Sequence, residues 1–157
     1  MKIKGLVNED FVNYKKANMF ISMPFCTFKC DMENGCECCQ NSQLAHTEII
    51  QIDPEKLIKN YLENEITSAI VFGGLEPFDS YQELKGFIEL FRKKSQDDIV
   101  IYTGYYEREI FDEIRELKQF PNIIIKYGRF IPGHSPIYDE VLGVNLASKN
   151  QFAIKIS

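Results

Sequence analysis

The order of apolar segments in this sequence predicts an α/β fold with a mostly parallel sheet. Four short apolar runs lack the alternation of a half-exposed strand, which is typical of strands buried on both faces. Helical patterns separate these runs, and parallel strands require such crossover connections. The length of 157 residues and the hydrophobic content of 45% fit a single domain over residues 1–157.

The four runs consist mainly of β-branched and aromatic residues, which favour strands. They cover residues 19–21, 69–72, 99–102 and 123–125. Residues 48–52 form a fifth, weaker candidate with alternating character. We therefore expect four central strands, each followed by a connection that returns to the same side of the sheet.

Three helices are expected between the later strands. Asp53 can cap a helix whose first residue is Pro54, because aspartate accepts from free N–H groups and proline is favoured at the first position. A buried stripe is expected at Leu57, Ile58, Tyr61 and Leu62.

The second and third helices show similar patterns. Ser80 and Glu83 fit a capping box, and the inward residues expected to follow are Leu84, Phe87, Ile88 and Phe91. The third helix is expected from about residue 107, ending before Pro121. Its inward residues are expected to be Ile110, Phe111, Ile114 and Leu117.

The carboxyl ends of the predicted strands carry the unusual stretches of the sequence. Right-handed crossovers place all four ends at one edge, where ligands bind in such folds. The stretches that follow the strands are a cysteine-rich loop, Gly73-Gly74, Thr103-Gly104 and Tyr127-Gly128. We therefore expect one ligand site built from these four segments.

Charge and hydropathy exclude several other classes. The net charge of −5 disfavours a nucleic-acid surface. No apolar run is long enough for a membrane span, and no apolar segment of a secretory signal follows the N-terminus. We therefore expect a cytoplasmic protein without membrane or nucleic-acid partners, in a compartment where thiols stay reduced.

All five cysteines lie between residues 26 and 39. A structural zinc site usually takes two separated ligand pairs, whereas this chain has one cluster, and His46 and His134 stand alone. Soft thiolates in a tight loop also suit an iron–sulfur cluster. Cys38 and Cys39 are adjacent, so one of them is expected to point away from such a cluster. A zinc knuckle remains the alternative.

Six short motifs occur in an order that resembles the radical S-adenosylmethionine (SAM) superfamily and, within it, the anaerobic ribonucleotide reductase activating proteins. EDFVNY resembles the opening D-x-V-N-Y, and CCQN resembles the C-x-N around the third cysteine of CxxxCxxC. GGLEP resembles GG-D/E-P, YTGY a strand end of the family, YGRF its D-G-x-F, and SKNQ its G-S-x-N-Q.

The resemblance implies a fold and a set of ligands. The fold would be a partial (β/α) barrel of the radical SAM type with helices outside. Cys26, Cys30 and Cys39 would hold a [4Fe-4S] cluster, and Gly73, Gly74, Glu76 and Thr103 would help to bind SAM. Residues 31–38 stand where the family pattern has two residues, so Cys36 and Cys38 are rivals to Cys39, which is preferred because Asn41 follows it.

The resemblance also implies the reaction and its partners. The reduced cluster would cleave SAM, and the resulting radical would take a hydrogen atom from a glycine of a large glycyl-radical reductase subunit. An electron donor such as flavodoxin or ferredoxin would supply the electron, and no protein side chain is expected to act as acid, base or nucleophile. The alternatives are a radical SAM enzyme for a small molecule or peptide, as in 7-carboxy-7-deazaguanine synthases, and a non-catalytic zinc or iron–sulfur module.

Overall fold

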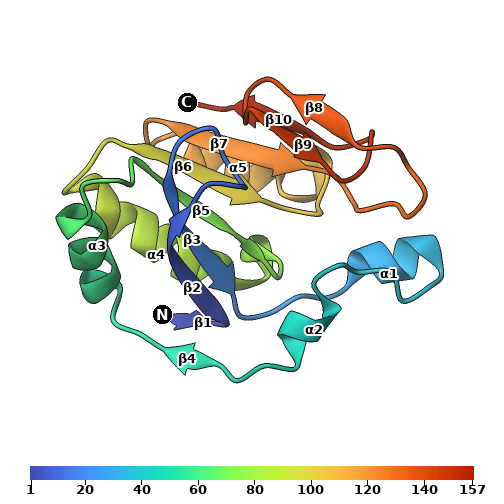
Figure 1. Cartoon of the computed structure of the whole chain (residues 1–157), viewed down its shortest axis with the longest axis horizontal. Coiled ribbons are helices and arrows are strands. Elements are labelled where there is room, and N and C mark those ends of the chain that lie inside the picture. Colours follow the sequence, from blue (N-terminus) through green and yellow to red (C-terminus); the bar gives the residue numbers. More distant parts are fainter.

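A six-stranded sheet forms the centre of the structure, a computed structural model that describes residues 1–157 (Figure 1). The strands lie in the order β10-β7-β6-β5-β3-β2, in which β3, β5, β6 and β7 are parallel and both edge strands are antiparallel. Their bounds are β2 Gly5–Asp10, β3 Asn18–Met23, β5 Ala69–Gly74, β6 Asp98–Tyr102, β7 Ile123–Tyr127 and β10 Phe152–Lys155.

Two small antiparallel pairs lie apart from this sheet. β1 (Lys2–Ile3) pairs with β4 (Ile50–Gln51), and β8 (Ile137–Asp139) pairs with β9 (Val144–Leu146). The weak strand expected at residues 48–52 is therefore only two residues long, and it does not join the main sheet.

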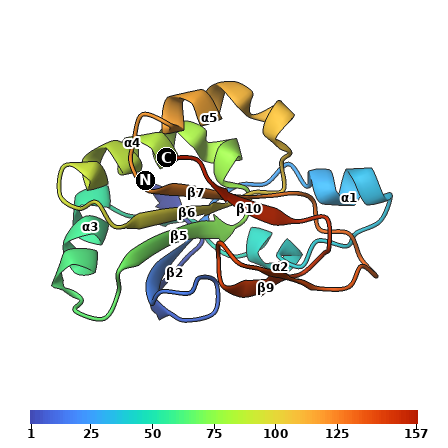
Figure 2. The ribbon, with the colours of Figure 1, turned by 90° about the horizontal axis from the view of Figure 1, so that it is seen from above.

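The helices that connect the parallel strands pack on one face of the sheet. Figure 2 shows α4 and α5 on one side of the sheet and α2 with β9 on the other. None of the helices is both long enough and apolar enough to cross a membrane. The helical bounds are α1 Lys29–Asn34, α2 Ser42–Ala45, α3 Pro54–Glu63, η1 Pro77–Ser80, α4 Tyr81–Arg92, η2 Glu107–Glu109 and α5 Phe111–Leu117.

The predicted α/β class with a mostly parallel sheet is confirmed. The expected runs fall within β3, β5, β6 and β7, although β7 continues two residues further, through Lys126 to Tyr127. The sheet is open, since β2 and β10 are free edges, and no closed barrel forms. The partial barrel of the radical SAM type stays a prediction.

Both helix starts predicted from caps are confirmed, since α3 follows Asp53 and α4 follows Ser80, but only one of the two caps forms its predicted hydrogen bond. The Asp53 side chain accepts a hydrogen bond from the Glu55 N–H at 3.0 Å, as a cap should. The capping box at Ser80 is wrong. The Ser80 hydroxyl has no hydrogen-bond partner, and the Glu83 carboxylate accepts from the N–H of Lys2 instead, at 2.7 Å.

The predicted helix faces are correct except at one position in each of two helices. Leu62 of α3 is exposed, and Phe111 is 62% exposed at the start of α5. Both lie at the margin of their helix stripes, where a periodic pattern cannot tell whether the sheet reaches far enough to cover the side chain.

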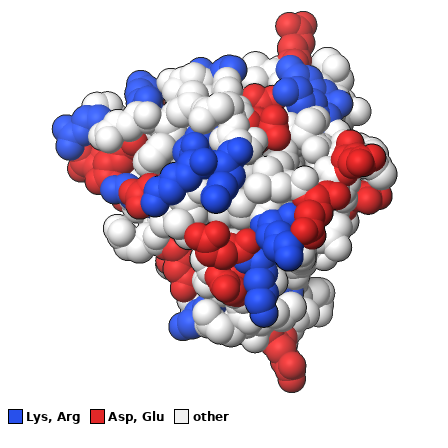
Figure 3. Space-filling model, turned by 90° about the vertical axis from the view of Figure 1, so that its left-hand side faces the viewer, with Lys and Arg blue, Asp and Glu red and all other residues white.

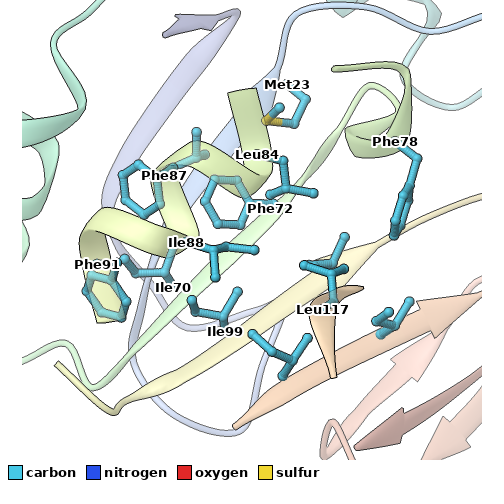
Figure 4. Close-up of a cluster of buried hydrophobic side chains, with 14 of the residues drawn as sticks. Met23, Ile70, Phe72, Phe78, Leu84, Phe87, Ile88, Phe91, Ile99 and Leu117 are labelled. Atoms are coloured by element: carbon cyan, nitrogen blue, oxygen red, sulfur yellow. The ribbon is translucent and has the colours of Figure 1, made fainter. Parts of the chain in front are cut away.

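The larger core cluster lies between the sheet and α3, α4 and α5. The α4 residues that enter this core are Leu84, Phe87, Ile88 and Phe91. Figure 4 shows Phe87 facing Phe72 of β5, and the two rings meet edge to face with centroids 5.3 Å apart. Burial of aromatic rings in this geometry stabilises the helix on the sheet.

The opposite face of the sheet carries a smaller core. Val71, Val100 and Ile124 point to this side, where Tyr14 and Leu142 cover them. The Tyr14 hydroxyl donates to the Asp98 carboxylate at 3.0 Å, which holds the segment between β2 and β3 against the sheet. Because no long helix packs here, the carboxyl ends of the strands remain open on this face.

The end of the molecule that carries α3 has a mixed surface. Figure 3 shows acidic and basic side chains interspersed on this face, without a large area of one sign. Lys59 and Glu63 form an ion pair along α3.

We predict that Phe87→Ala lowers the free energy of unfolding by about 3–5 kcal/mol, because it removes a fully buried ring and leaves a cavity. Phe111→Ala is the matched control, and its effect should stay within about 0.5 kcal/mol since this ring is exposed. Urea unfolding of both variants measures the difference. Equal losses would contradict the position of the core.

Candidate functional site

A cavity of about 490 Å³ lies at the carboxyl ends of the parallel strands. Its size is typical of a small-molecule or cofactor site. Every one of the six motifs contributes to its wall. The lining residues from these motifs are Val12 and Asn13, Cys39 to Asn41, Gly74 to Glu76, Tyr102 to Gly104, Gly128 with Phe130, and Gln151.

The cavity separates the five cysteines into two groups. Cys26, Cys30 and Cys39 line it, whereas Cys36 and Cys38 do not. The Cys36 side chain is exposed, and the Cys38 sulfur lies 3.5 Å from the Asn34 side-chain nitrogen, outside the cavity. The three thiols that line the cavity are those predicted to be ligands.

The residues between Cys30 and Cys39 form most of the short helix α1 and a loop that leads back to the cavity. α1 begins after Phe28, whose φ of 52° is unusual for a non-glycine residue. The Asp31 carboxylate then accepts from the N–H groups of Cys38 and Cys39 at 2.9 and 2.8 Å. Asp31 therefore turns the loop back and brings Cys39 to the cavity.

Backbone N–H groups lie near the sulfurs of Cys26 and Cys39. The Phe28 N–H donates to the Cys26 sulfur at 3.3 Å, and the Asn41 N–H favours the thiolate of Cys39. Burial nevertheless raises the pKa of the Cys26 thiol to about 12, and it raises the pKa of Cys39 as well. Both thiols are therefore protonated at neutral pH in the absence of metal, and binding of iron would displace the protons.

No three cysteine, histidine or acidic side chains converge closely enough to hold a single metal ion. Each iron of a four-iron cluster takes its own thiolate, so cluster ligands stand around the cluster and do not meet at one point. Three thiols around one cavity wall fit this requirement. Cys26, Cys30 and Cys39 are therefore suitable donors for an iron–sulfur cluster.

Glu76 is a buried carboxylate in the cavity wall. It accepts hydrogen bonds from the Thr103 hydroxyl at 2.7 Å, the Gly104 N–H at 2.9 Å and the Phe78 N–H at 3.1 Å. Burial raises its pKa, and these three donors oppose that effect. A carboxylate has about four acceptor positions, so Glu76 keeps one for a ligand.

Thr103 and Gly104 serve mainly to hold Glu76 and the cluster loop. The Thr103 hydroxyl donates to Glu76 and accepts from the Tyr105 N–H, so it has no free donor for a ligand. A Cβ at Gly104 would lie 3.3 Å from the Cys30 sulfur, which is tighter than usual packing. The structure therefore requires a small residue beside Cys30.

The two glycines that end β5 have different environments. Gly74 lines the cavity with a φ of 76°, and a Cβ there would lie 2.8 Å from the Leu44 side chain. Gly73 does not line the cavity. It gives room to the Phe20 ring, which a Cβ would approach to 3.1 Å. A role for Gly73 in binding SAM stays a prediction.

The motifs YGRF and SKNQ are hydrogen-bonded to each other. The Gln151 side-chain NH₂ donates to the Gly128 carbonyl at 3.2 Å, and that of Asn150 donates to the Arg129 carbonyl at 2.9 Å. These bonds connect the SKNQ segment to the loop after β7. The two motifs thus depend on each other, and both contribute residues to the cavity wall.

Two important residues of the site were not found by sequence reasoning. Asp31 gave no signal, because its bonds are made within an irregular loop. Lys126 lines the cavity and is buried, with 7% of its surface exposed. A signal for Lys126 was present, since it is a single charge at the end of the apolar run IIIK.

Comparison with protein families matches residues 16–144 to the family described as 4Fe-4S single cluster domain. The match covers more than half of the chain and includes all five cysteines. No curated protein and no solved structure gave a match.

We predict that Asp31→Ala accelerates the loss of iron from the reconstituted protein, because two N–H groups lose a charged acceptor worth about 1.5–3 kcal/mol each. Asp31→Asn is the matched control, since its amide oxygen still accepts. Transfer of iron to a coloured chelator under anaerobic conditions measures the rate. Identical rates for Asp31→Ala and wild type would contradict the role of this carboxylate.

Proposed function

Starting from the finding that the chain belongs to the family of 4Fe-4S single cluster domains, we propose that it is a radical SAM enzyme. In this proposal residues 1–157 act as one domain of the partial-barrel type. One observation carries it: all six motifs that resemble the radical SAM activating proteins contribute to the wall of one cavity. Motifs matched by chance would have no reason to meet there.

The proposed ligands of the [4Fe-4S] cluster are Cys26, Cys30 and Cys39. Three thiolates leave one iron without a protein ligand, which is the arrangement of an open, catalytic metal site. When bound, the cluster and SAM would supply one-electron reductive cleavage of a sulfonium. The Phe28 N–H hydrogen-bonds to the Cys26 sulfur, and such a bond tunes the potential of a cluster.

The residues after β5 and β6 would bind SAM. Gly74 lets the backbone approach the ligand, since it has no side chain to fill the space. The remaining acceptor position of Glu76 suits the ammonium group of an amino acid. Thr103 and Gly104 would act through Glu76, which they hold in place.

A large glycyl-radical reductase subunit is the proposed substrate. The cavity opens beside Val12, which is 74% exposed, and the neighbouring Phe11 is 65% exposed. Exposed apolar residues at the mouth of a site suit contact with a protein better than with water. A glycine-containing loop of that subunit would enter the cavity, and flavodoxin or ferredoxin would supply the electron.

A small-molecule radical SAM enzyme is the second candidate. The observation in its favour is the extended cysteine loop that forms α1, because the 7-carboxy-7-deazaguanine synthases also lengthen this loop. A zinc-binding module is less well supported, since the thiols do not converge on a single ion.

We predict that alanine at Cys26, Cys30 or Cys39 abolishes the cluster, because each replacement removes the only protein ligand of one iron. Cys36→Ala and Cys38→Ala are matched controls from the same loop, and both should keep the full iron content. Iron and sulfide analysis after anaerobic reconstitution measures the outcome. Loss of the cluster in Cys36→Ala or Cys38→Ala, with retention in Cys39→Ala, would reassign the third ligand.

We predict that SAM changes the EPR spectrum of the reduced wild-type protein, since it would bind at the open iron. With the large reductase subunit present, 5′-deoxyadenosine and a glycyl-radical signal should follow. Cys39→Ala is the negative control. A cluster spectrum indifferent to SAM would refute the enzyme, whereas 5′-deoxyadenosine without a glycyl radical would favour the small-molecule candidate.

A further inference from the structure

Arg129 is a buried charge in the loop after β7. Only 5% of its side chain is exposed. Its neighbours Gly128 and Phe130 line the cavity, whereas Arg129 does not, so its side chain does not face a ligand in the cavity. Within the motif YGRF it stands at the unspecified position of D-G-x-F, and the resemblance therefore assigns it no role.

The Arg129 guanidinium connects segments that are far apart in the chain. It donates to the Glu109 carboxylate of η2 at 2.7 Å, and its Nε lies 3.1 Å from the Glu33 carboxylate of α1, in an ion pair without a hydrogen bond. It also donates to the Gly104 carbonyl. The Tyr106 ring lies 4.9 Å from the guanidinium carbon, within cation–π distance. One side chain thus joins α1 to the segment after β6.

The short helix α1 depends on polar contacts of this kind. It has six residues and none of them is buried, so apolar packing does little to hold it in place. Asn34 donates to a carbonyl of the loop after β7 at 2.9 Å, and Lys29 pairs with Glu109 at 3.5 Å. Arg129 is the most buried of the side chains that make these contacts, and it is therefore the centre of the attachment of α1.

The same attachment places Cys30, the second residue of α1. A Cβ at Gly104 would lie 3.3 Å from the Cys30 sulfur, and Arg129 holds the carbonyl of this glycine. Burial lowers the pKa of Arg129, but the charges of Glu109, Glu33 and Cys30 outweigh this effect and raise it. The guanidinium is therefore close enough to Cys30 for a charge on the sulfur to act on it.

We propose that Arg129 is a positioning residue for the cluster, which holds Cys30 at the cavity and raises the reduction potential through its positive charge. The inference rests on the cluster ligands of the proposed function. Reduction adds a negative charge to a cluster, and a buried cation nearby stabilises that charge. The side chains of Glu33 and Glu109 are 48% and 24% exposed, so solvent screens them more strongly than it screens Arg129.

The experiment measures two properties of anaerobically reconstituted protein. One is the rate of iron transfer to a chelator, and the other is the midpoint potential from a redox titration followed by EPR. Arg129→Gln should release iron about 10- to 100-fold faster, as expected for loss of a charged hydrogen bond. Its one-electron equilibrium should also shift about tenfold toward the oxidised cluster, which lowers the potential by about 59 mV.

Three further variants separate attachment from charge. Arg129→Lys keeps the charge without the planar fork, so it should release iron faster at the wild-type potential. Glu33→Gln should also release iron faster, but its potential should not fall, because this variant removes a negative charge. Glu33 is half-exposed, so this variant serves even where Arg129→Gln does not fold. Arg115→Gln, from an exposed ion pair with Asp112, is the control with the same change in net charge as Arg129→Gln.

Three results would overturn the proposal. A wild-type potential or a wild-type rate of iron release in Arg129→Gln would remove Arg129 from this role, while leaving the proposed function intact. An equal fall in potential in Arg129→Lys or in Arg115→Gln would show that the charge at this position is not the cause. Failure of the wild-type protein to assemble a four-iron cluster would instead refute the proposed function itself, and this inference with it.

Discussion

The buried carboxylate of Glu76 fixes the geometry on which the site depends. It joins the segment after β5 to the segment after β6, because it accepts from Phe78 in its own segment and from Thr103 and Gly104 after β6. Gly104 in turn lies beside the Cys30 sulfur, which a Cβ at this position would approach to 3.3 Å. One anion therefore sets the distance between two strand ends and the position of a cysteine in the cavity wall.

The cysteine loop depends on a second carboxylate of a different kind. Asp31 belongs to the loop itself and holds it folded by accepting from the N–H groups of Cys38 and Cys39. The long spacing after Cys30 is therefore compatible with a three-cysteine site, because α1 and the loop that follows it accommodate the residues beyond the usual family spacing. Cys36 and Cys38 lie in this loop and do not line the cavity.

The cavity wall contains two buried charged side chains, Glu76 and Lys126, which differ in how well the protein compensates them. Glu76 is largely satisfied by protein donors, whereas Lys126 has two long hydrogen bonds to carbonyls and the Tyr102 ring at 5.8 Å. Buried charges that form no ion pair add little to the stability of a fold. The open face of the sheet, with its small core, leaves the space for the cavity.

The sequence by itself determined the strands, most of each helix face and the meeting of the cysteine, glycine and acidic segments, because apolar periodicity and the handedness of crossovers are properties of the chain order. It could not determine that Leu62 and Phe111 are exposed, or that Glu83 bonds to Lys2 and does not cap its own helix. Only the tertiary structure decided which three thiols line the cavity, how many acceptor positions of Glu76 stay free, and that Lys126 is buried without an ion pair. These features depend on contacts between residues far apart in the chain, and no local pattern encodes which donors and acceptors are already in use.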